Sequence, residues 1–283
     1  MNMTTKPEDS TKCVEELKEW INRQPHLPKN IGNNLLLRFA HSCYYDLEKT
    51  KKALEMFFTV RGTCSDLLTN RDPQSAQMQK VIKIIDLCQY RISGNRWLWI
   101  WQLNDPGLEN YDYISDVKFF FLSTDCNFLV GEDLPEEDIV MMDAKDITLR
   151  FLTKINLSVA RRLAKYQEAT MPIRLKQIHV VNAPPFIDKI YGALKPFMKK
   201  EITEMIHFHP PKSETLYKYF SKDELPSNYG GTRPSMLELK EDVMAKIASN
   251  RDALLDENLW RIVDKKKTES SIDAGSFRTL AID

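Results

Sequence analysis

Residues 171–200 read MPIRLKQIHVVNAPPFIDKIYGALKPFMKK, and they predict a short strand, a turn forced by proline, and an amphipathic helix. In the first part, apolar side chains fall mostly at every second position, as on a strand with two unlike faces. Pro184 and Pro185 cannot continue a hydrogen-bonded ladder, so the strand ends just before them. From 186 to 198, apolar side chains recur at helical spacing. This pattern alone is typical of a core helix in an α/β domain.

Strand-like and helix-like segments alternate through the middle of the chain. The aromatic run WLWIWQL at 97–103 and the run DIVMMD at 138–143 have the composition of strands. Residues 113–130 and 158–169 carry apolar side chains at helical spacing. Such alternation predicts an α/β fold with a mainly parallel sheet covered by helices.

The chain divides into three expected parts. Residues 12–70 are helical in pattern, and the turn Arg71-Asp72-Pro73 leads out of them. We therefore expect a small helical module at 1–72 and the main α/β domain at 73–235. The strongly charged remainder, 236–283, predicts a surface helix and a loose tail.

The composition predicts a cytoplasmic protein. Its 283 residues suffice for one large domain and a small helical one. Forty basic and forty acidic side chains give no net charge, so we expect no nucleic-acid partner. No apolar run approaches the ~18 residues that span a bilayer, and the first residues do not resemble a signal peptide. The five cysteines are odd in number and far apart, which indicates a reducing compartment. We expect a monomer.

No catalytic motif is visible in the chain. Glycine is scarce, at nine residues, and the glycine-rich phosphate and dinucleotide motifs do not occur. His207 and His209 could supply two zinc ligands from a strand, but no third ligand stands at a recognisable spacing. A helix end, where histidine suits the negative end of the dipole, explains them more simply. Asp143 and Asp146 have no nucleophile or base beside them. We expect no enzymatic activity, metal or cofactor.

Four blocks of the chain, in this order and spacing, resemble the CRAL-TRIO lipid-binding family. The blocks are IHVVNAPPF at 178–186, LKPFM at 194–198, IHFH at 206–209 and LPSNYGG at 225–231. The run at 35–61 resembles the helical module that precedes the lipid-binding domain in this family. The tocopherol-transfer and retinaldehyde-binding branch is the most similar. The resemblance implies a carrier that holds a hydrophobic molecule in a cavity closed by a mobile gate helix, here 186–198.

Mapping the family's cavity onto this chain gives a set of expected ligand-binding residues. Taken singly, each of them is more often plain core than ligand contact. The set consists of Val117, Phe120, Phe121, Thr124, Met142, Leu163, Tyr166, Ile173, Leu175, Ile178, Ile190, Leu194, Phe197 and Met198. Thr124 and Tyr166 would be the polar groups that reach a ligand hydroxyl or an ordered water.

The resemblance also implies a basic site for a phosphoinositide headgroup. Two of its positions keep a basic residue, as Arg174 and Lys176, although a solvated strand face would explain these equally well. Three positions depart from the family's pattern: Cys43, Glu201 and Met205. An acidic side chain opposes a phosphate, which needs charge-assisted donors. Lys199 and Lys200 stand nearby in the sequence and would have to substitute.

The function that we expect is that of a carrier for one hydrophobic small molecule, exchanged at a membrane surface without chemical change. Candidate ligands are a tocopherol, a retinoid, a carotenoid or another isoprenoid. A phospholipid or phosphatidylinositol exchange protein is one alternative. A protein-interaction adaptor that has lost its cavity is another.

Overall fold

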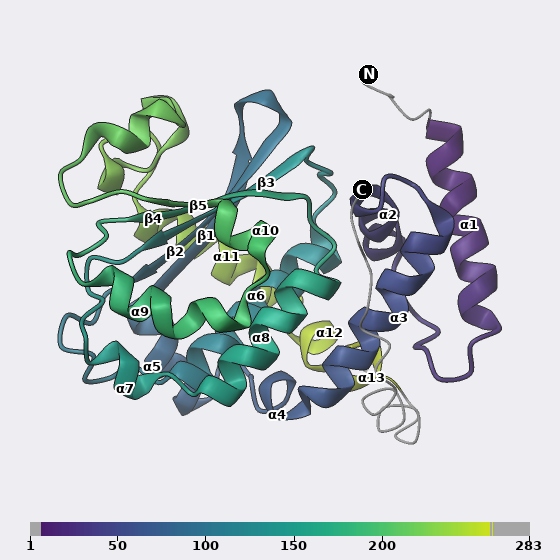
Figure 1. Ribbon diagram of the computed structural model, residues 1–283. Helices are drawn as coiled ribbons and strands as arrows, with labels where there is room; N and C mark the ends of the chain where they lie inside the picture. Colours follow the sequence, from purple (N-terminus) through teal and green to yellow (C-terminus); the bar gives the residue numbers. More distant parts are fainter. Residues whose placement is uncertain (1–6, 261, 263–283) are drawn as a thin grey trace.

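The computed structural model describes residues 7–260 and residue 262 (Figure 1). Within these residues, helices cover a five-stranded sheet, and a group of N-terminal helices packs against one end of it. This mixed α/β architecture was predicted from the sequence. The tail that the sequence predicts near the C-terminus lies outside the described residues.

The N-terminal residues fold around a small apolar core. They form α1 (Pro7–Asn22), α2 (Asn33–Ser42), α3 (Leu47–Thr63) and α4 (Ser65–Leu68). Leu17, Phe39 and Phe57 from three of these helices are fully buried. Asp46 fixes the start of α3, because its carboxylate accepts a hydrogen bond of 3.0 Å from the backbone N–H of Lys49. That bond satisfies a donor which the first turn of a helix leaves free.

The sheet is mainly parallel, and its order follows the sequence. Its strands are β1 (Ile85–Ile92), β2 (Arg96–Leu103), β3 (Glu137–Asp143), β4 (Leu175–Val181) and β5 (Ile206–Phe208). The hairpin of β1 and β2 is antiparallel, and all other neighbours run parallel. The hairpin turns at Gly94, whose φ of 70° suits a residue without a β-carbon. Because the strands lie in the order β1-β2-β3-β4-β5, β3 is the middle strand of the sheet.

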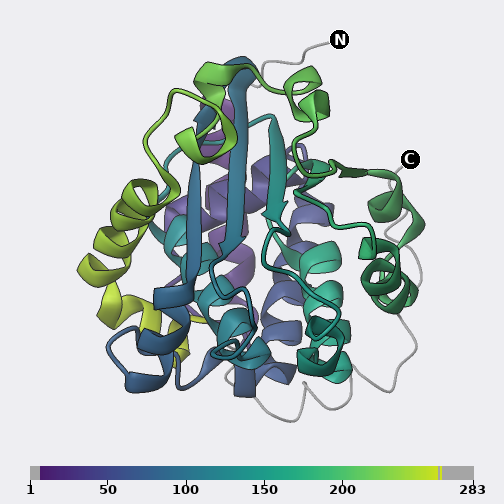
Figure 2. The ribbon, with the colours of Figure 1, turned by 90° about the vertical axis from the view of Figure 1, so that its left-hand side faces the viewer.

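Helices connect the strands and pack on both sides of the sheet. Those that follow the N-terminal module are α5 (Ala76–Ile84), α6 (Tyr113–Val130), α7 (Phe151–Lys154), α8 (Leu157–Thr170), α9 (Ile187–Leu194) and α10 (Lys200–Glu204). The C-terminal helices are α11 (Met236–Ser249), α12 (Arg251–Leu255) and α13 (Glu257–Trp260). In Figure 2, α11 lies on one side of the sheet and α8 to α10 on the other. α6 packs on α8, where the rings of Phe121 and Tyr166 lie 4.7 Å apart.

Two elements differ from the sequence prediction. The helix expected over 186–198 ends at Leu194 and continues as a 3-10 turn, η2 (Lys195–Phe197). Pro196 explains this break, because it has no N–H to donate to the preceding turn of an α-helix. The histidine pair expected at a helix end lies instead at β5 and just after it, where the chain pairs with β4. That expectation was wrong, because pairing with β4 rather than local preference sets this short strand.

Candidate functional site

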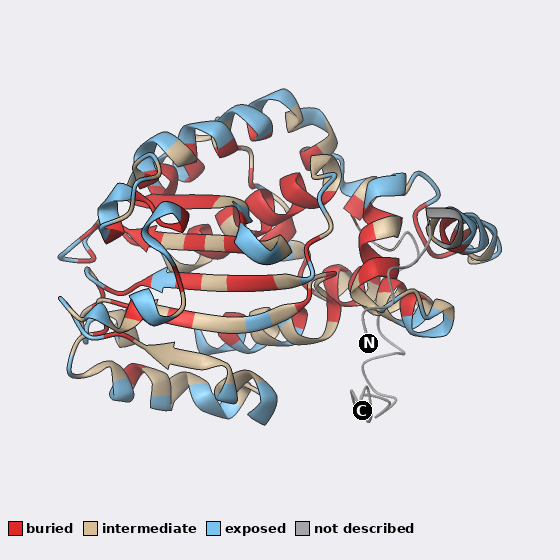
Figure 3. Ribbon diagram, turned by 90° about the horizontal axis from the view of Figure 1, so that it is seen from above, coloured by how far each residue is buried: buried red, intermediate tan, exposed pale blue. Residues whose placement is uncertain are grey.

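One face of the sheet carries apolar side chains from four strands. Residues paired side by side in a sheet point to the same side, so the register assigns these side chains to one face. We call it the open face, and its apolar members that are not fully buried include Trp97, Trp99, Trp101, Val140, Met142, Leu175, Ile178, Val180, Ile206 and Phe208. Figure 3 shows how buried and half-buried residues alternate along the strands.

The open face is incompletely covered by the rest of the chain. Met142 stands on the middle strand, yet its side chain is 41% exposed, whereas its neighbour Met141 on the other face is 0% exposed. The other apolar members of the open face are half-buried. Central strands of a parallel sheet are normally buried on both faces. The open face therefore leaves apolar surface in contact with solvent, and an apolar molecule could cover it.

A β-bulge at the start of β4 aligns its apolar side chains. Leu175 pairs with Asp138, but Gln177 pairs with Ile139, so one extra residue, Lys176, is accommodated on β4. Leu175 and Ile178 consequently share a face, although their spacing is odd. The bulge explains why the apolar pattern of this strand follows period two only in part.

The residues expected to bind a ligand differ widely in burial. Val117, Phe121, Thr124, Tyr166 and Ile190 are buried. Those that are half-buried are Phe120, Leu163, Ile173, Leu175, Ile178, Leu194, Phe197 and Met198. Only Met142 of the set is exposed. The structure thus brings the β3 and β4 members together on the open face, while several of the α6 and α8 members lie in the packed core.

The two expected polar contacts are already engaged within the protein. The Thr124 hydroxyl donates to the carbonyls of Phe120 and Phe121, at 3.0 and 3.2 Å. The Tyr166 hydroxyl accepts a hydrogen bond from Arg61 at 3.2 Å, and its side chain is fully buried. Both hydroxyls therefore already have partners within the protein, and their contact with a ligand stays a prediction.

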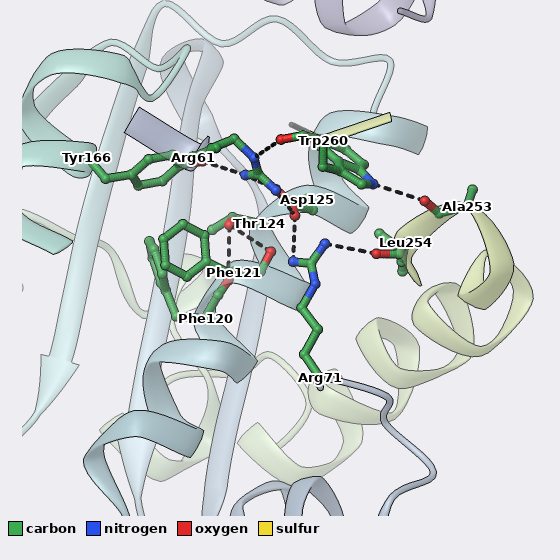
Figure 4. A network of polar contacts seen from close by, with 10 residues as sticks. All are labelled: Arg61, Arg71, Phe120, Phe121, Thr124, Asp125, Tyr166, Ala253, Leu254 and Trp260. Carbon is green, nitrogen blue, oxygen red and sulfur yellow. Dashed lines mark hydrogen bonds and ion pairs between the residues drawn. The ribbon is translucent and has the colours of Figure 1, made fainter. Parts of the chain in front are cut away.

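A buried ionic network holds α6 and α8 in place behind the site (Figure 4). Arg61 binds both carboxylate oxygens of Asp125, at 2.8 and 2.7 Å, and Arg71 binds one of them at 2.6 Å. Arg61 also donates to the carbonyl of Trp260, and Arg71 to that of Leu254. Burial opposes the charge of Arg61, but Asp125 raises the pKa of this guanidinium above its usual value. Nothing in the sequence pattern marks this network.

α9 and η2 rest on their surroundings through apolar contacts. The Ile190 side chain is buried, and the ring of Tyr191 lies 5.5 Å from that of Phe208 on β5. Residues 184–198 contribute no side-chain hydrogen bond or ion pair to another element of the described chain. Apolar contacts are non-directional, so this segment can move without breaking directional bonds.

Arg174 fastens the N-terminal helices to the sheet. Its side chain is 8% exposed, donates to the carbonyl of His41 at 3.0 Å, and pairs with Glu136. Its guanidinium also stacks over the ring of Tyr44 at 4.1 Å. Burial, followed by the charge of Arg174, lowers the pKa of His41 to about 4. With its donors engaged in this way, Arg174 does not present itself to a phosphate in this conformation.

The three lysines of the expected headgroup site differ from Arg174. Lys176, Lys199 and Lys200 are exposed. Lys200 pairs with Glu204 at 3.6 Å, a surface ion pair of the kind that contributes little stability. The basic site expected from the sequence is therefore split between one buried clamp and three solvated side chains.

Two tryptophans of β2 were missing from the expected site. The indole N–H of Trp99 donates to Asp138 at 2.9 Å, and that of Trp101 to Asp116 at 3.1 Å. Burial raises the pKa of Asp116 to about 6, although its hydrogen bonds from Tyr111 and Trp101 oppose the shift. The alternation in WLWIW could have identified both indoles, because it places every second residue on one face.

The sequence also raised a metal site and a pair of carboxylates as candidates. The described residues contain no group of three or more histidine, cysteine, aspartate or glutamate side chains arranged to hold a metal ion. Asp143 accepts hydrogen bonds from the backbone of Lys145 and the amide of Asn182, both at 2.9 Å, and so ends its strand in a capped turn. No helix in the described part of the chain is both long and apolar enough to cross a membrane.

Comparisons with known proteins agree with this geometry. Residues 6–78 match the family model "Pinta-like, UBA domain", and residues 135–231 match the model "CRAL/TRIO domain". Human "Alpha-tocopherol transfer protein-like" is 22% identical over 237 residues, covering 80% of this chain and 67% of that protein. "Clavesin-1" of Xenopus laevis is 29% identical over 240 residues, covering 83% and 71%.

Among solved structures, "Crystal structure of Sfh5" aligns with a TM-score of 0.48 and 11% identity, over 89% of this chain and 100% of that one. The matched domain contains β3, β4, β5, α8 and α9, which form most of the open face and its cover. Residues 135–231 thus match a CRAL/TRIO domain, and most of the chain is similar to these two proteins, at 22% and 29% identity.

Proposed function

We propose that this protein is a carrier that binds one hydrophobic small molecule between the open face and α9 and exchanges it at membranes. The exposure of Met142 on the middle strand is the observation that carries the proposal. An apolar surface exposed at the centre of a sheet is costly in water, and a bound ligand removes that cost. A ligand that buries ~400 Å² at ~25 cal/mol per Å² gains about 10 kcal/mol of gross driving force.

Such a ligand leaves the protein slowly in water, so release must be coupled to a movement at the membrane. We propose that α9 and η2 form the gate. Their contacts with the sheet are apolar, as in the pairing of Tyr191 with Phe208, and Leu194 and Phe197 are only half-buried. A lifted gate would expose these side chains to the acyl region of a bilayer, which offsets the cost of their exposure to water.

The surface beside the gate suits transient contact with a membrane. Leu149 and Leu157 flank α7, which contacts α9, and their side chains are 43% and 53% exposed. Lys189, Lys195 and Lys199 are exposed on the gate and directly after it. Apolar side chains next to lysines bind the surface of a bilayer that contains anionic lipids. We therefore propose peripheral contact with anionic membranes from the cytoplasmic compartment.

The ligand that we favour is a rigid isoprenoid-derived molecule of the tocopherol, retinoid or carotenoid kind. Three indoles of β2 and the Phe208 ring lie on the open face, and aromatic side chains offer flat, rigid contact area. Met142 adapts to irregular shapes. One relative bears a name that refers to alpha-tocopherol transfer, which supports the same class. We assign the ligand-binding unit to 73–235, with 1–72 and 236–283 as supporting parts.

Native mass spectrometry of the purified protein, followed by extraction and identification of the bound molecule, tests the proposal. We expect one ligand of a few hundred daltons, or uptake of one from a panel of tocopherols, retinoids and carotenoids. A diacyl phospholipid would indicate an exchange protein instead. Absence of any ligand and any uptake would indicate the adaptor.

A pair of variants locates the binding site. Met142→Trp fills space over the open face and should abolish uptake. Leu237→Trp is the matched control, because Leu237 is a 60% exposed apolar residue on α11, on the other side of the sheet. Equal uptake by both variants would refute the assignment of the open face.

A further inference from the structure

Three histidines meet where β4 and β5 pair. His179 on β4 stacks on His207 and His209, with ring centroids 5.1 and 5.2 Å apart. His179 is 0% exposed and His209 3% exposed, and His207 is half-buried. Because His179 pairs with Met141, the cluster lies on the opposite side of the sheet from the open face. The proposed ligand site therefore does not use these residues.

With both buried rings neutral, their hydrogen bonds form one consistent chain. His179 donates through Nε2 to the Gln177 side-chain oxygen at 2.9 Å. Its Nδ1 can then accept from His209 Nε2, at 2.9 Å. His209 Nδ1 accepts in turn from the Thr215 hydroxyl, also at 2.9 Å. Protonation of both rings would place two N–H donors face to face and break this chain.

Among the described residues, no acidic side chain compensates a proton at this place. Met141 from β3, and Tyr219 and Phe220 from the segment after the 3-10 turn η3 (Glu214–Lys218), surround His179. The Tyr219 hydroxyl faces His207 Nδ1 at 3.2 Å. In the described part of the chain, the ionisable groups that act on His179 are His209 and His207.

Burial, and then these two neighbours, lowers the pKa of His179 to about 3. Burial also lowers the pKa of His209. Both shifts agree with the geometry, which provides neither solvent nor an opposite charge for a second positive ring.

The histidine contact joins the two ends of the gate segment. The chain leaves β4, forms α9, η2 and α10, and returns as β5, so residues 182–205 form a crossover anchored at both ends. His209 N–H donates to the Val180 carbonyl and its own carbonyl accepts from Ala183 N–H, each at 2.9 Å. These bonds, together with the His179–His209 contact, hold β5 beside β4.

We propose that the His179–His209 pair is a proton-sensitive latch, in which proton uptake separates β5 from β4 and frees the crossover that carries the gate. That this separation releases a ligand rests on the proposed function. The separation of β5 from β4 does not depend on it. An acidic membrane surface or compartment would then favour release. Proton uptake by the two histidines is the only binding event that opens the latch.

The expected size follows from linkage. Consider a histidine that stays neutral while the latch is closed and has an ordinary pKa of about 6.5 once the latch is open. Its protonation makes the equilibrium constant for opening about 30-fold larger at pH 5.0 than at pH 7.5. Two such histidines multiply this factor. Opening should therefore increase by at least about tenfold across this range, even when one ring carries most of the effect.

Backbone hydrogen–deuterium exchange of the full chain, corrected for the intrinsic pH dependence of exchange, measures this opening. At pH 5.0 the protection of residues 178–209 should fall at least about tenfold relative to pH 7.5. The double variant His179→Gln and His209→Gln keeps hydrogen-bonding side chains without a titrating ring, and its protection should change less than twofold. If it fails to fold, His209→Gln alone should show a smaller response than the unsubstituted chain.

His26→Gln is the matched control, because it removes a buried histidine of the N-terminal module that pairs with Glu55. It should retain the full response. Exchange in α2 is followed separately, since the pKa of His41 is lowered there too. A response below threefold in the unsubstituted chain, or a full response in the double variant, would overturn the latch. The measurement needs no ligand or vesicle, so its failure is distinguishable from failure of the carrier function.

Discussion

Replacing Asp125 by Asn tests the buried network behind the site. Asp125 is 0% exposed and compensates two guanidinium groups that are 0% and 2% exposed, Arg61 and Arg71. Asn has almost the same shape but carries no charge, so the variant leaves two positive charges uncompensated in the core. Removing one partner of a buried ion pair costs about 3–5 kcal/mol. For a chain of this size, that corresponds to a decrease in Tm of about 6–20 °C.

Asp66 provides a control with the same bond geometry and a different environment. It pairs with both terminal nitrogens of Arg162, at 2.6 and 2.9 Å, but its side chain is 59% exposed. Asp66→Asn should therefore cost at most about 1 kcal/mol. Urea unfolding followed by tryptophan fluorescence measures both variants under the same conditions. Equal losses of stability would refute the argument that burial, rather than the bond itself, determines the cost.

Three further predictions concern the gate, the clamp and a buried carboxyl. Leu194→Asp should lower transfer between vesicles without lowering the Tm, whereas Leu237→Asp on α11 should leave transfer unchanged; equal transfer by both variants argues against the gate. Arg174→Ala should weaken the docking of α2 and expose its amides to hydrogen exchange, and it should not lower binding to phosphoinositide vesicles more than to neutral ones. Burial raises the pKa of Asp116 to about 6, so the folded state binds this proton more tightly than the unfolded state does. The resulting stability is lost as pH rises from about 4 to 7. The free energy of unfolding of Asp116→Asn should therefore vary with pH by up to about 3 kcal/mol less than that of the unsubstituted chain, as measured by unfolding titrations.

The sequence predicted the elements whose pattern is local. α6 has the predicted bounds, 113–130, and β2 begins one residue before the predicted 97. Long helical periodicity and an alternating aromatic run are signals that tertiary contacts rarely override. β5 has three residues, and only its pairing with β4 makes it a strand. A sequence pattern of that length carries no comparable information.

The candidate site was harder to predict, because charge and burial are separate properties. Arg174 has the residue type of a phosphate ligand, but its place directly before β4 directs it to His41 and Glu136. Thr124 has a hydroxyl, but helix geometry gives that hydroxyl two carbonyls of the preceding turn. Met142 and Ile178 were expected in the site, and the register places both on the open face. Whether a ligand contacts them stays a prediction.

The crossover from β4 to β5 determines how far the gate can travel. As long as His209 stays bonded to Val180, both ends of the segment are fixed, and α9 can only pivot about the residues that flank it. A pivot of this kind can uncover the edge of the open face but leaves Tyr191 close to Phe208, whose rings pack 5.5 Å apart. For the carrier function that we propose, passage of a rigid ligand would require more room than that. Release of β5 supplies this room, because the strand contributes only three residues to the sheet and its detachment leaves the other strand pairs intact.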